Sequence, residues 1–420
     1  MKKNIWMFHH YATPPTMSGL VRPYEFSKQL KIKGYKSTVF ASAFLHYTSE
    51  NLISDTRKHI EHLDNGVRFI FVRSSEYKGN GLSRVLNMIS FAYNLFSVTK
   101  SLLKKEEKPD VIYASSPHPL TLLAGIRIAH KLKISCICEV RDLWPESLVA
   151  YRIIKRNSLI AKILYQGEKW IYKKADKLIF TMEGGKDYII ERGWDKESGG
   201  PIDLDKVHHI NNGVDLEVFD NNRKHCLLED DDLANEDIFK VIYTGSIRRA
   251  NNLELIINAA KYVNEKSDAN IKFLIFGDGS ERENLENRCK TENIYNVIFK
   301  GQVCKKYIPY IVSKSNLNIL NYSYHDIWKY GGSQNKKFEY LASGRPVLST
   351  ITMGYDIIKK YGAGISLSDQ SAESIGEAII AIANMNRDEY LTMSNNARNA
   401  AQDYDFKVLT KKLIEIIEDV

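Results

Sequence analysis

Short apolar runs alternate along this chain with longer segments whose apolar residues recur at helical spacing. In the first half, the apolar runs predict strands at residues 3–8, 35–41, 67–72, 109–114, 135–140 and 175–180. The segments between them predict helices at residues 22–33, 82–103 and 185–192. A strand, a helix and a second strand in succession form a βαβ unit, so this half is expected to build a parallel α/β sheet.

The second half of the chain repeats the pattern. Strands are predicted at residues 240–244, 271–276, 297–300, 317–320 and 347–350, with a helix at 253–263 and mostly helical sequence after residue 371. Between the halves, residues 194–205 are polar and rich in glycine, which is typical of a hinge. With 420 residues, the chain is expected to form two Rossmann-like domains, at 1–200 and 206–400, and a C-terminal helix at 401–420 that crosses back to the first domain.

Residues 331–349 read as a loop, a short helix, a stop and a strand. Gly331 and Gly332 form the loop, and Asn335 is expected to cap the helix. Gly344 ends the helix, and Pro346 prevents it from resuming. The apolar residues of its buried face are Phe338, Leu341 and Ala342. The alternative interpretation is an ordinary capped helix of an α/β domain.

The start of this helix has the chemistry of an anion site. The free amides of Asn335, Lys336 and Lys337 lie at the positive end of the helix dipole, and the two lysines add charge, which suits a diphosphate. Glu339 lies one turn further and accepts hydrogen bonds, so sugar hydroxyls next to the phosphates are its natural partners. The loop residues expected to contact the same ligand are Gly332, Ser333 and Gln334.

This stretch resembles the donor-sugar motif of the retaining, nucleotide-sugar-dependent glycosyltransferases of family 4 (group 1), which have the two-domain GT-B fold. In that family, two acidic residues separated by seven others flank the helix start. The second contacts the ribose, and the first contacts the transferred sugar. Glu339 matches the second position, whereas Gly331 occupies the first. The resemblance implies two parallel sheets that face each other across a cleft.

Residues 240–252 predict a strand, a glycine turn and a basic loop on the donor side. Arg248 and Arg249 are assigned as a diphosphate clamp from their chemistry alone. The family presents an arginine directly after the glycine and a lysine a few residues later. In this chain Ser246 and Asn251 stand at those positions. Other donor contacts implied by the resemblance are Gly245, Gly277, Gln302 and Val303, the last two lying where the nucleobase packs.

The first domain is expected to carry the acceptor side. Ligands of parallel sheets lie at the carboxyl ends of the strands, so Ser18 and Gly19, in the loop after the first strand, are expected to face a ligand. His118 follows the strand at 109–114 between two prolines, and it resembles a family histidine that lies near the transferred sugar. A surface loop histidine is the alternative. The chain has no G-x-G-x-x-G motif, which counts against a dinucleotide-dependent oxidoreductase.

The segment at 141–147 follows a predicted strand and is costly to bury. Its carboxylates, guanidinium and indole are suited to gripping a sugar through hydrogen bonds and stacking. The residues concerned are Arg141, Asp142, Trp144 and Glu146. The segment resembles its counterpart in N-acetylfucosaminyl and colanic-acid-type transferases, which build bacterial surface polysaccharides. The alternative is a salt-bridged helix start with Trp144 in the core.

The charge of the chain is unevenly distributed. Residues 1–200 hold 32 Lys and Arg against 19 Asp and Glu, whereas the remainder holds 27 against 32. The segment at 151–174 is basic and amphipathic, which predicts peripheral contact with an anionic membrane surface. A domain helix with a solvated lysine face is the alternative. No nucleic-acid motif accompanies the charge, so no nucleic acid is expected.

The five cysteines lack paired CxxC spacing and nearby histidines, so neither a disulfide framework nor a metal site is expected. Apolar runs are too short for a membrane span, and the one near the N-terminus is too short for a signal peptide. These features predict a cytoplasmic protein, at most peripheral on the inner face of the plasma membrane.

The resemblance implies a retaining, metal-independent hexosyl- or N-acetylhexosaminyl-transferase without a cofactor. Its expected donor is a UDP-sugar, and its expected acceptor is a glycan or a polyprenyl-diphosphate-linked saccharide in O-antigen or capsule synthesis. The expected catalytic residues are His118, Arg248, Arg249 and Glu339. Two alternatives stay open. A nucleotide-sugar epimerase would convert the donor without an acceptor, and a non-catalytic GT-B module fits Gly331 and Ser246, which stand where the family has charge.

Overall fold

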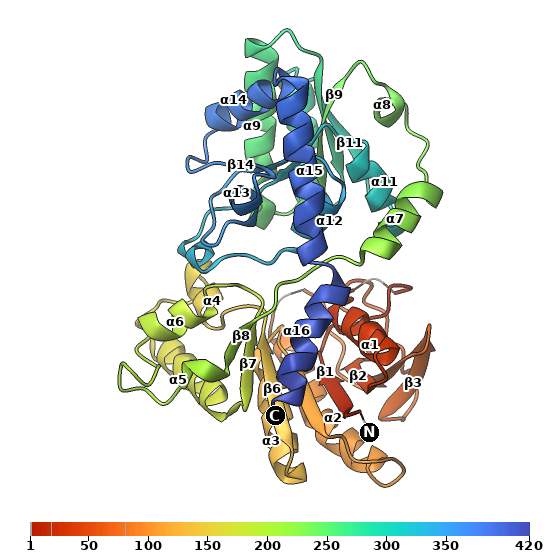
Figure 1. Cartoon of the computed structure of the whole chain (residues 1–420), viewed down its shortest axis with the longest axis vertical. Coiled ribbons are helices and arrows are strands. Elements are labelled where there is room, and N and C mark those ends of the chain that lie inside the picture. Colours follow the sequence, from red (N-terminus) through yellow and green to blue (C-terminus); the bar gives the residue numbers. More distant parts are fainter. Residues whose placement is uncertain (1, 18, 80) are drawn as a thin grey trace. The chain divides into compact units, whose positions relative to one another are not determined.

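A computed structural model describes residues 2–17, 19–79 and 81–420 of the chain, which divides into two compact units (Figure 1). Unit 1 comprises Met1–Asn211 and Leu409–Val420, and unit 2 comprises Asn212–Val408. The chain passes from unit 1 to unit 2 after Asn211. The sequence pattern predicts that the second domain starts at residue 206.

Unit 1 contains a sheet in the order β3-β4-β2-β1-β5-β6-β7-β8. All neighbouring strands are parallel except β3, which pairs antiparallel with β4. The carboxyl ends of the parallel strands therefore share one edge of the sheet. The strands are β1 (Asn4–Phe8), β2 (Lys36–Ser42), β3 (His59–Asp64), β4 (Val67–Val72), β5 (Val111–Ser115), β6 (Ser135–Val140), β7 (Lys177–Phe180) and β8 (Val207–His209).

The helices that connect these strands cover the sheet of unit 1. They are α1 (Arg22–Ile32), α2 (Leu82–Leu102), α3 (Pro119–Leu132), α4 (Glu146–Ala150), α5 (Leu159–Lys174) and α6 (Gly185–Glu191). Helix α3 packs against both α2 and α5. These three helices therefore form one layer.

Unit 2 contains a parallel sheet in the order β11-β10-β9-β12-β13-β14. Its strands are β9 (Phe239–Thr244), β10 (Ile271–Phe276), β11 (Val297–Gly301), β12 (Leu317–Leu320), β13 (Val347–Ser349) and β14 (Gly364–Ser366). Its helices are α7 (Leu216–His225), α8 (Asp231–Ala234), α9 (Leu253–Lys266), α10 (Arg282–Thr291), α11 (Ile308–Ser313), α12 (Asn335–Ala342), α13 (Ile357–Tyr361), α14 (Ala372–Ala383) and α15 (Arg387–Asp403).

The last helix, α16 (Phe406–Glu418), ends against unit 1. Its buried apolar positions include Leu409, Leu413 and Ile417. The Lys3 ammonium donates to the carbonyl of Ile417 at 2.6 Å. Apolar burial and this hydrogen bond hold the C-terminal residues on the unit that contains the N-terminus.

The predicted α/β class, with two parallel sheets, is confirmed, and each predicted strand is present to within a few residues. The edge strand β3 was not predicted, because it has no apolar run; only one of its six residues, Asp64, is buried. A local signal for it exists. Asn65 and Gly66 both have positive φ angles, of 47° and 80°, in the two-residue turn that joins β3 to β4. Asn-Gly is the sequence that favours such a hairpin turn.

Candidate functional site

The carboxyl edge of the unit 2 sheet is made of closely packed glycine backbone. The Gly245 amide donates to Phe276 at 2.9 Å, and the Gly277 amide donates to Gly301 at 2.8 Å. A Cβ atom on Gly277 would lie 1.8 Å from the carbonyl oxygen of Gly245, and its φ of +152° also favours glycine. The edge therefore presents bare backbone at the ends of β9 and β10, where ligands of parallel sheets bind.

Lys336, in the first turn of α12, extends to this edge. Its ammonium donates to the Tyr243 hydroxyl at 3.0 Å and lies 4.2 Å from the centre of the Tyr243 ring. It would lie 2.6 Å from a Cβ atom placed on Gly245. Glycine at 245 leaves space for the ammonium, so Lys336 places a positive charge directly beside the glycine turn after β9.

Burial lowers the pKa of Lys336 from its ordinary value to about 7, and the nearby Glu339 carboxylate only partly opposes this shift. The ammonium is therefore poorly compensated by the protein. A bound anion with several charged oxygens would supply the missing compensation.

Ser246 and Asn251 interact with each other at the same edge. The Asn251 side-chain amide donates to the Ser246 carbonyl at 2.7 Å and to its hydroxyl oxygen at 2.9 Å. The Tyr243 hydroxyl also donates to the Ser246 carbonyl, at 3.0 Å. Asn251 thus stabilises the turn. Because Ser246 and Asn251 are both uncharged, the positive charge beside this turn comes from Lys336.

Arg248 and Arg249 are exposed where the loop after β9 enters a short 3-10 helix (Arg249–Asn251). Both guanidiniums are accessible to a ligand. Gln302 is exposed directly after β11, and Val303 packs against a core cluster that includes Leu274. Of this pair, Gln302 is the more exposed residue.

Helix α12 begins differently from the prediction. Gln334 is its N-cap residue, and no side chain caps the helix, so the prediction that Asn335 caps it is wrong. Asn335 is instead the first helical residue. Lys337 is buried and donates to the carbonyl of Gly332 at 2.8 Å. It holds the preceding loop in place, so Lys336 alone of the two lysines extends to the edge beside Gly245.

Glu339 lies one turn into α12 with 22% of its side chain exposed. Its nearest cationic neighbour is the exposed Lys305, at 4.0 Å. At this distance the pair is loose, and the carboxylate keeps acceptor capacity for a ligand.

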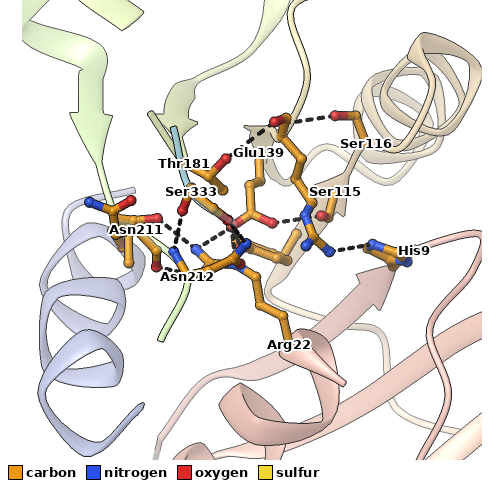
Figure 2. A network of polar contacts seen from close by, with 12 residues as sticks. His9, Arg22, Ser115, Ser116, Glu139, Thr181, Asn211, Asn212 and Ser333 are labelled. Atoms are coloured by element: carbon orange, nitrogen blue, oxygen red, sulfur yellow. Dashed lines mark hydrogen bonds and ion pairs between the residues drawn. The ribbon is translucent and has the colours of Figure 1, made fainter. Parts of the chain in front are cut away.

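The loop before α12 is held by Asn212, which was not predicted as a site residue. Its backbone amide donates to the Ser333 hydroxyl at 2.7 Å, and its side-chain amide donates to the Ser333 carbonyl (Figure 2). The Gln334 side-chain oxygen is buried without a hydrogen-bond partner among the described residues. Ser333 is therefore a structural anchor of the loop, and Gln334 retains an unused acceptor.

In unit 1, His118 is buried at the start of α3, at the carboxyl edge of β5. Its Nε2 atom lies 2.6 Å from Nδ1 of His10, and the His10 ring stacks on Phe91 at 4.4 Å. Burial and the nearby Arg84 lower the pKa of His118 to about 3, so this histidine is neutral at physiological pH. The alternative of a surface histidine does not hold.

Arg141 follows β6 at the same edge, and its guanidinium lies 3.0 Å from Nε2 of His9. Asp142 is exposed and Trp144 is half-buried. Glu146 is buried, and its carboxylate accepts hydrogen bonds from Arg156 and, at 2.6 Å, from the Tyr165 hydroxyl. Because both oxygens of Glu146 are occupied, the predicted sugar contact is not supported for this residue, which follows the salt-bridge alternative instead.

A buried ion pair lies beneath this edge (Figure 2). The Arg22 guanidinium lies 2.6 Å from the Glu139 carboxylate, and it also donates to the backbone carbonyls of Ile210, at 2.8 Å, and Asn211. The Ser115 hydroxyl donates to Glu139 at 2.6 Å. The pair fixes the last residues of unit 1 before the chain enters unit 2, and sequence reasoning did not identify it.

The first loop of unit 1 is only partly described. Ser18, a predicted ligand contact, lies outside the described residues. A Cβ atom on Gly19 would lie 2.3 Å from the Thr13 hydroxyl, so the backbone at Gly19 lies close to that side chain.

The described residues contain no group of three or more histidine, cysteine or acidic side chains that could hold a metal ion. None of the helices in the described part of the chain has the length and apolar character that crossing a bilayer requires.

Two α/β units with these parallel sheets define a protein of the GT-B fold. Residues 21–218 match the family Glycosyltransferase Family 4, and residues 228–400 match the family Glycosyl transferases group 1. The two matches follow one another along the chain, with the Family 4 match first and the group 1 match second.

The chain is also similar to individual proteins. The chain is 27% identical over 227 residues to a probable glycosyltransferase, WbjE, of Pseudomonas aeruginosa, and the match covers 53% of this chain and about half (52%) of that relative. The structure is similar to sucrose-phosphate synthase from Thermosynechococcus elongatus, with a TM-score of 0.73, 17% identity and coverage of 100% and 99% of the two chains. It is also similar to Anabaena Alr3699/HepE in complex with UDP-glucose, with a TM-score of 0.67, 13% identity and full coverage of both chains. At these identities the two structures show the fold alone.

Proposed function

We propose that this protein is a retaining glycosyltransferase that moves a sugar from a nucleotide diphosphate donor to an acceptor hydroxyl. The observation that carries the proposal is the poorly compensated Lys336 ammonium beside Gly245, at the carboxyl edge of the unit 2 sheet. A diphosphate bound there meets this charge and the free amides at the start of α12. Glu339, one turn further, accepts hydrogen bonds from sugar hydroxyls.

We propose UDP as the nucleotide. The Anabaena protein HepE, which is similar in fold, has been solved with UDP and with UDP-glucose. Gln302, exposed at the end of β11, is the side chain proposed to lie beside the base.

In this proposal, the configuration at the anomeric carbon is retained because the acceptor attacks from the front face. The bond between the anomeric carbon and the diphosphate oxygen breaks, and the bond to the acceptor oxygen forms on the same face of the sugar. The acceptor hydroxyl proton passes to the departing diphosphate oxygen. Lys336, Arg248 and Arg249 stabilise the charge that develops on the diphosphate, a role that fixed cations can fill without a metal ion.

The proposed acceptor is a hydroxyl of a glycan or of a polyprenyl-diphosphate-linked saccharide, at the inner face of the plasma membrane. The segment at 141–147 supports an acceptor of this kind, because it resembles its counterpart in transferases of bacterial surface polysaccharides. Within it, Asp142 and Trp144 keep side chains that a sugar can reach. His118 is proposed to contact the transferred sugar as a neutral imidazole.

A thermal-shift panel of nucleoside diphosphates tests the donor site. At about 100 times the dissociation constant, UDP is expected to stabilise the protein by roughly 2.7 kcal/mol, with EDTA as well as with Mg²⁺. Glu339→Ala is expected to weaken UDP binding by about tenfold or more, since it removes hydrogen bonds to a charged acceptor. The matched control is Glu265→Ala, at an exposed carboxylate on α9.

Three outcomes of this panel, combined with product assays on UDP-sugars, separate the alternatives. Absence of stabilisation by any nucleoside diphosphate would overturn the proposal. Binding of UDP without release of sugar from any donor, with or without acceptors, would identify a non-catalytic module. Conversion of a UDP-sugar to another UDP-sugar without an acceptor would identify an epimerase.

The pKa of Lys336 predicts that diphosphate binding depends on pH. The bound anion favours the ammonium, so binding raises this pKa above its value of about 7 in the free protein. Above pH 7 the free protein must take up a proton to bind, and the affinity for UDP is expected to fall by up to about tenfold per pH unit. Calorimetry between pH 6.5 and 9 measures this fall. Lys336→Arg keeps its charge throughout that range, so a wild-type slope in this variant would contradict the prediction.

A further inference from the structure

Helix α2 carries an apolar stripe that no other part of the described chain covers. The stripe consists of Leu82, Val85, Leu86, Ile89 and Tyr93, and exposure reaches 83% at Leu82 and 74% at Tyr93. Leu82, Val85 or Leu86, Ile89 and Tyr93 follow one another at intervals of three or four residues, so these side chains share one face of the helix. The opposite face, which includes Phe91 and Leu95, is buried against the unit 1 core.

Helix α5, in the same layer, carries a second stripe of the same kind. Leu159, Ile160 and Ile163 are exposed, and Trp170 lies further along this face. Its buried face includes Tyr165 and Tyr172, so this helix is also amphipathic and its outward face is uncovered.

A hollow of about 1310 Å³ lies between the two stripes, over α3. Tyr93 lines it from the side of α2, and Trp170 lines it from the side of α5, so the hollow joins the two stripes into one surface. Its cationic side chains are Lys58, Lys100, Arg127, Lys131, Lys133 and Lys174, against a single acidic residue, Asp176.

The charges around this surface have one sign. Residues 77–105, which contain α2, include five Lys and Arg and no Asp or Glu. Residues 151–174 include seven Lys and Arg, and their one acidic residue, Glu168, is buried against the hydroxyls of Tyr172 and Tyr188. Apolar ridges with cations between and around them complement an anionic bilayer, whose acyl region takes the apolar side chains and whose headgroups take the cations.

We infer that the outward faces of α2 and α5, with the hollow between them, form the surface by which this protein docks onto an anionic lipid bilayer. The inference rests on the proposed function, because a polyprenyl-linked acceptor is reached only from a membrane surface. It extends the sequence-based expectation, which concerned residues 151–174 alone. Helix α2 supplies the larger apolar stripe, and the hollow supplies additional cations.

Vesicle cosedimentation tests the inference on the full chain. The wild type is expected to bind vesicles of phosphatidylcholine mixed with phosphatidylglycerol and to bind pure phosphatidylcholine much more weakly. Leu86→Ser combined with Ile89→Ser is expected to lower binding about tenfold. The matched control is Leu227→Ser in unit 2, because Leu227 is 58% exposed and Leu86 is 59% exposed.

Charge is tested separately. Lys100→Glu combined with Lys131→Glu is expected to lower binding to the anionic vesicles about tenfold or more, whereas Lys266→Glu combined with Lys290→Glu in unit 2 leaves it unchanged. Arg156 is not a suitable site, because its pairing with the buried Glu146 supports the fold.

Unchanged vesicle binding in both surface variants would overturn the inference. So would a wild-type dimer that Leu86→Ser with Ile89→Ser converts to a monomer without loss of vesicle binding, because the occupant of the stripe would then be a second copy of the chain. Stabilisation by UDP is measured on every variant. If UDP binding persists and vesicle binding is absent in the wild type, the docking surface fails while the donor site stands. If vesicle binding is present and UDP binding is absent in the wild type, the donor site fails while the docking surface stands.

Discussion

Replacing Arg22 by methionine is expected to lower the free energy of unfolding of unit 1 by about 3–5 kcal/mol. Arg22 is only 3% exposed, and it is the cationic partner of the fully buried Glu139. Although burial raises the pKa of Glu139, Arg22 and Arg141 together hold it below its ordinary value. Methionine leaves that carboxylate without its closest cation, and it leaves the carbonyls of Ile210 and Asn211 without their donor.

Urea unfolding followed by tryptophan fluorescence measures this loss, since four of the five tryptophans lie in unit 1. Arg57→Met is the matched control. It removes an exposed ion pair with Asp55 and is expected to cost less than about 1 kcal/mol. Adding Glu139→Gln to Arg22→Met removes the unpaired charge and is expected to restore part of the stability. Equal losses for Arg22→Met and Arg57→Met would contradict the importance of the buried pair.

Lys336→Met is expected to weaken UDP binding by roughly 10- to 100-fold, the range for loss of a hydrogen bond between charged groups. The same substitution is expected to leave folding stability unchanged or higher at pH 6. At that pH the folded protein holds the ammonium charged despite its burial, whereas methionine has no charge to bury. Opposite effects on binding and stability are typical of a residue retained for a ligand.

Calorimetric titration with UDP, and thermal unfolding without ligand, measure these two quantities. Lys290→Met, at an exposed lysine of α10, is the control and is expected to change neither. If the Lys336→Met variant binds UDP as tightly as the wild type, Lys336 is not part of the donor site. A large loss of stability would instead assign it a structural role.

Local sequence patterns determined the architecture of this protein. The alternation of apolar runs with amphipathic segments predicts nearly all strands of both sheets, because strand and helix periodicity depend on neighbouring residues in the chain. Local chemistry pointed to Glu339, and the family resemblance pointed to Gly245 and Gly277. The backbone geometry explains the two glycines, since their φ angles of +142° and +152° are ones that other residues rarely adopt, and a Cβ atom on Gly277 would also collide with the Gly245 carbonyl.

Only the tertiary structure decided which polar side chains remain available to a ligand. Lys336 and Lys337 are adjacent and chemically identical, yet the helix directs one to the sheet edge and the other to the carbonyl of Gly332. The sequence predicts a sugar contact for Glu146, but the fold brings Arg156 and Tyr165 to its carboxylate. The availability of a charge depends on partners that are distant in sequence, and local pattern does not contain them.

The same limit applies to the uncovered faces of the helices. The sequence of α2 shows apolar residues around much of the helix, and only packing on the sheet determines which of them are buried. Phe91 enters the core, whereas Leu86 and Tyr93 stay exposed. The sequence by itself therefore determined the elements, the fold class and the basic character of the first half. The tertiary structure decided the pairing of buried charges and the exposure of apolar faces, because both depend on contacts between segments far apart in the chain.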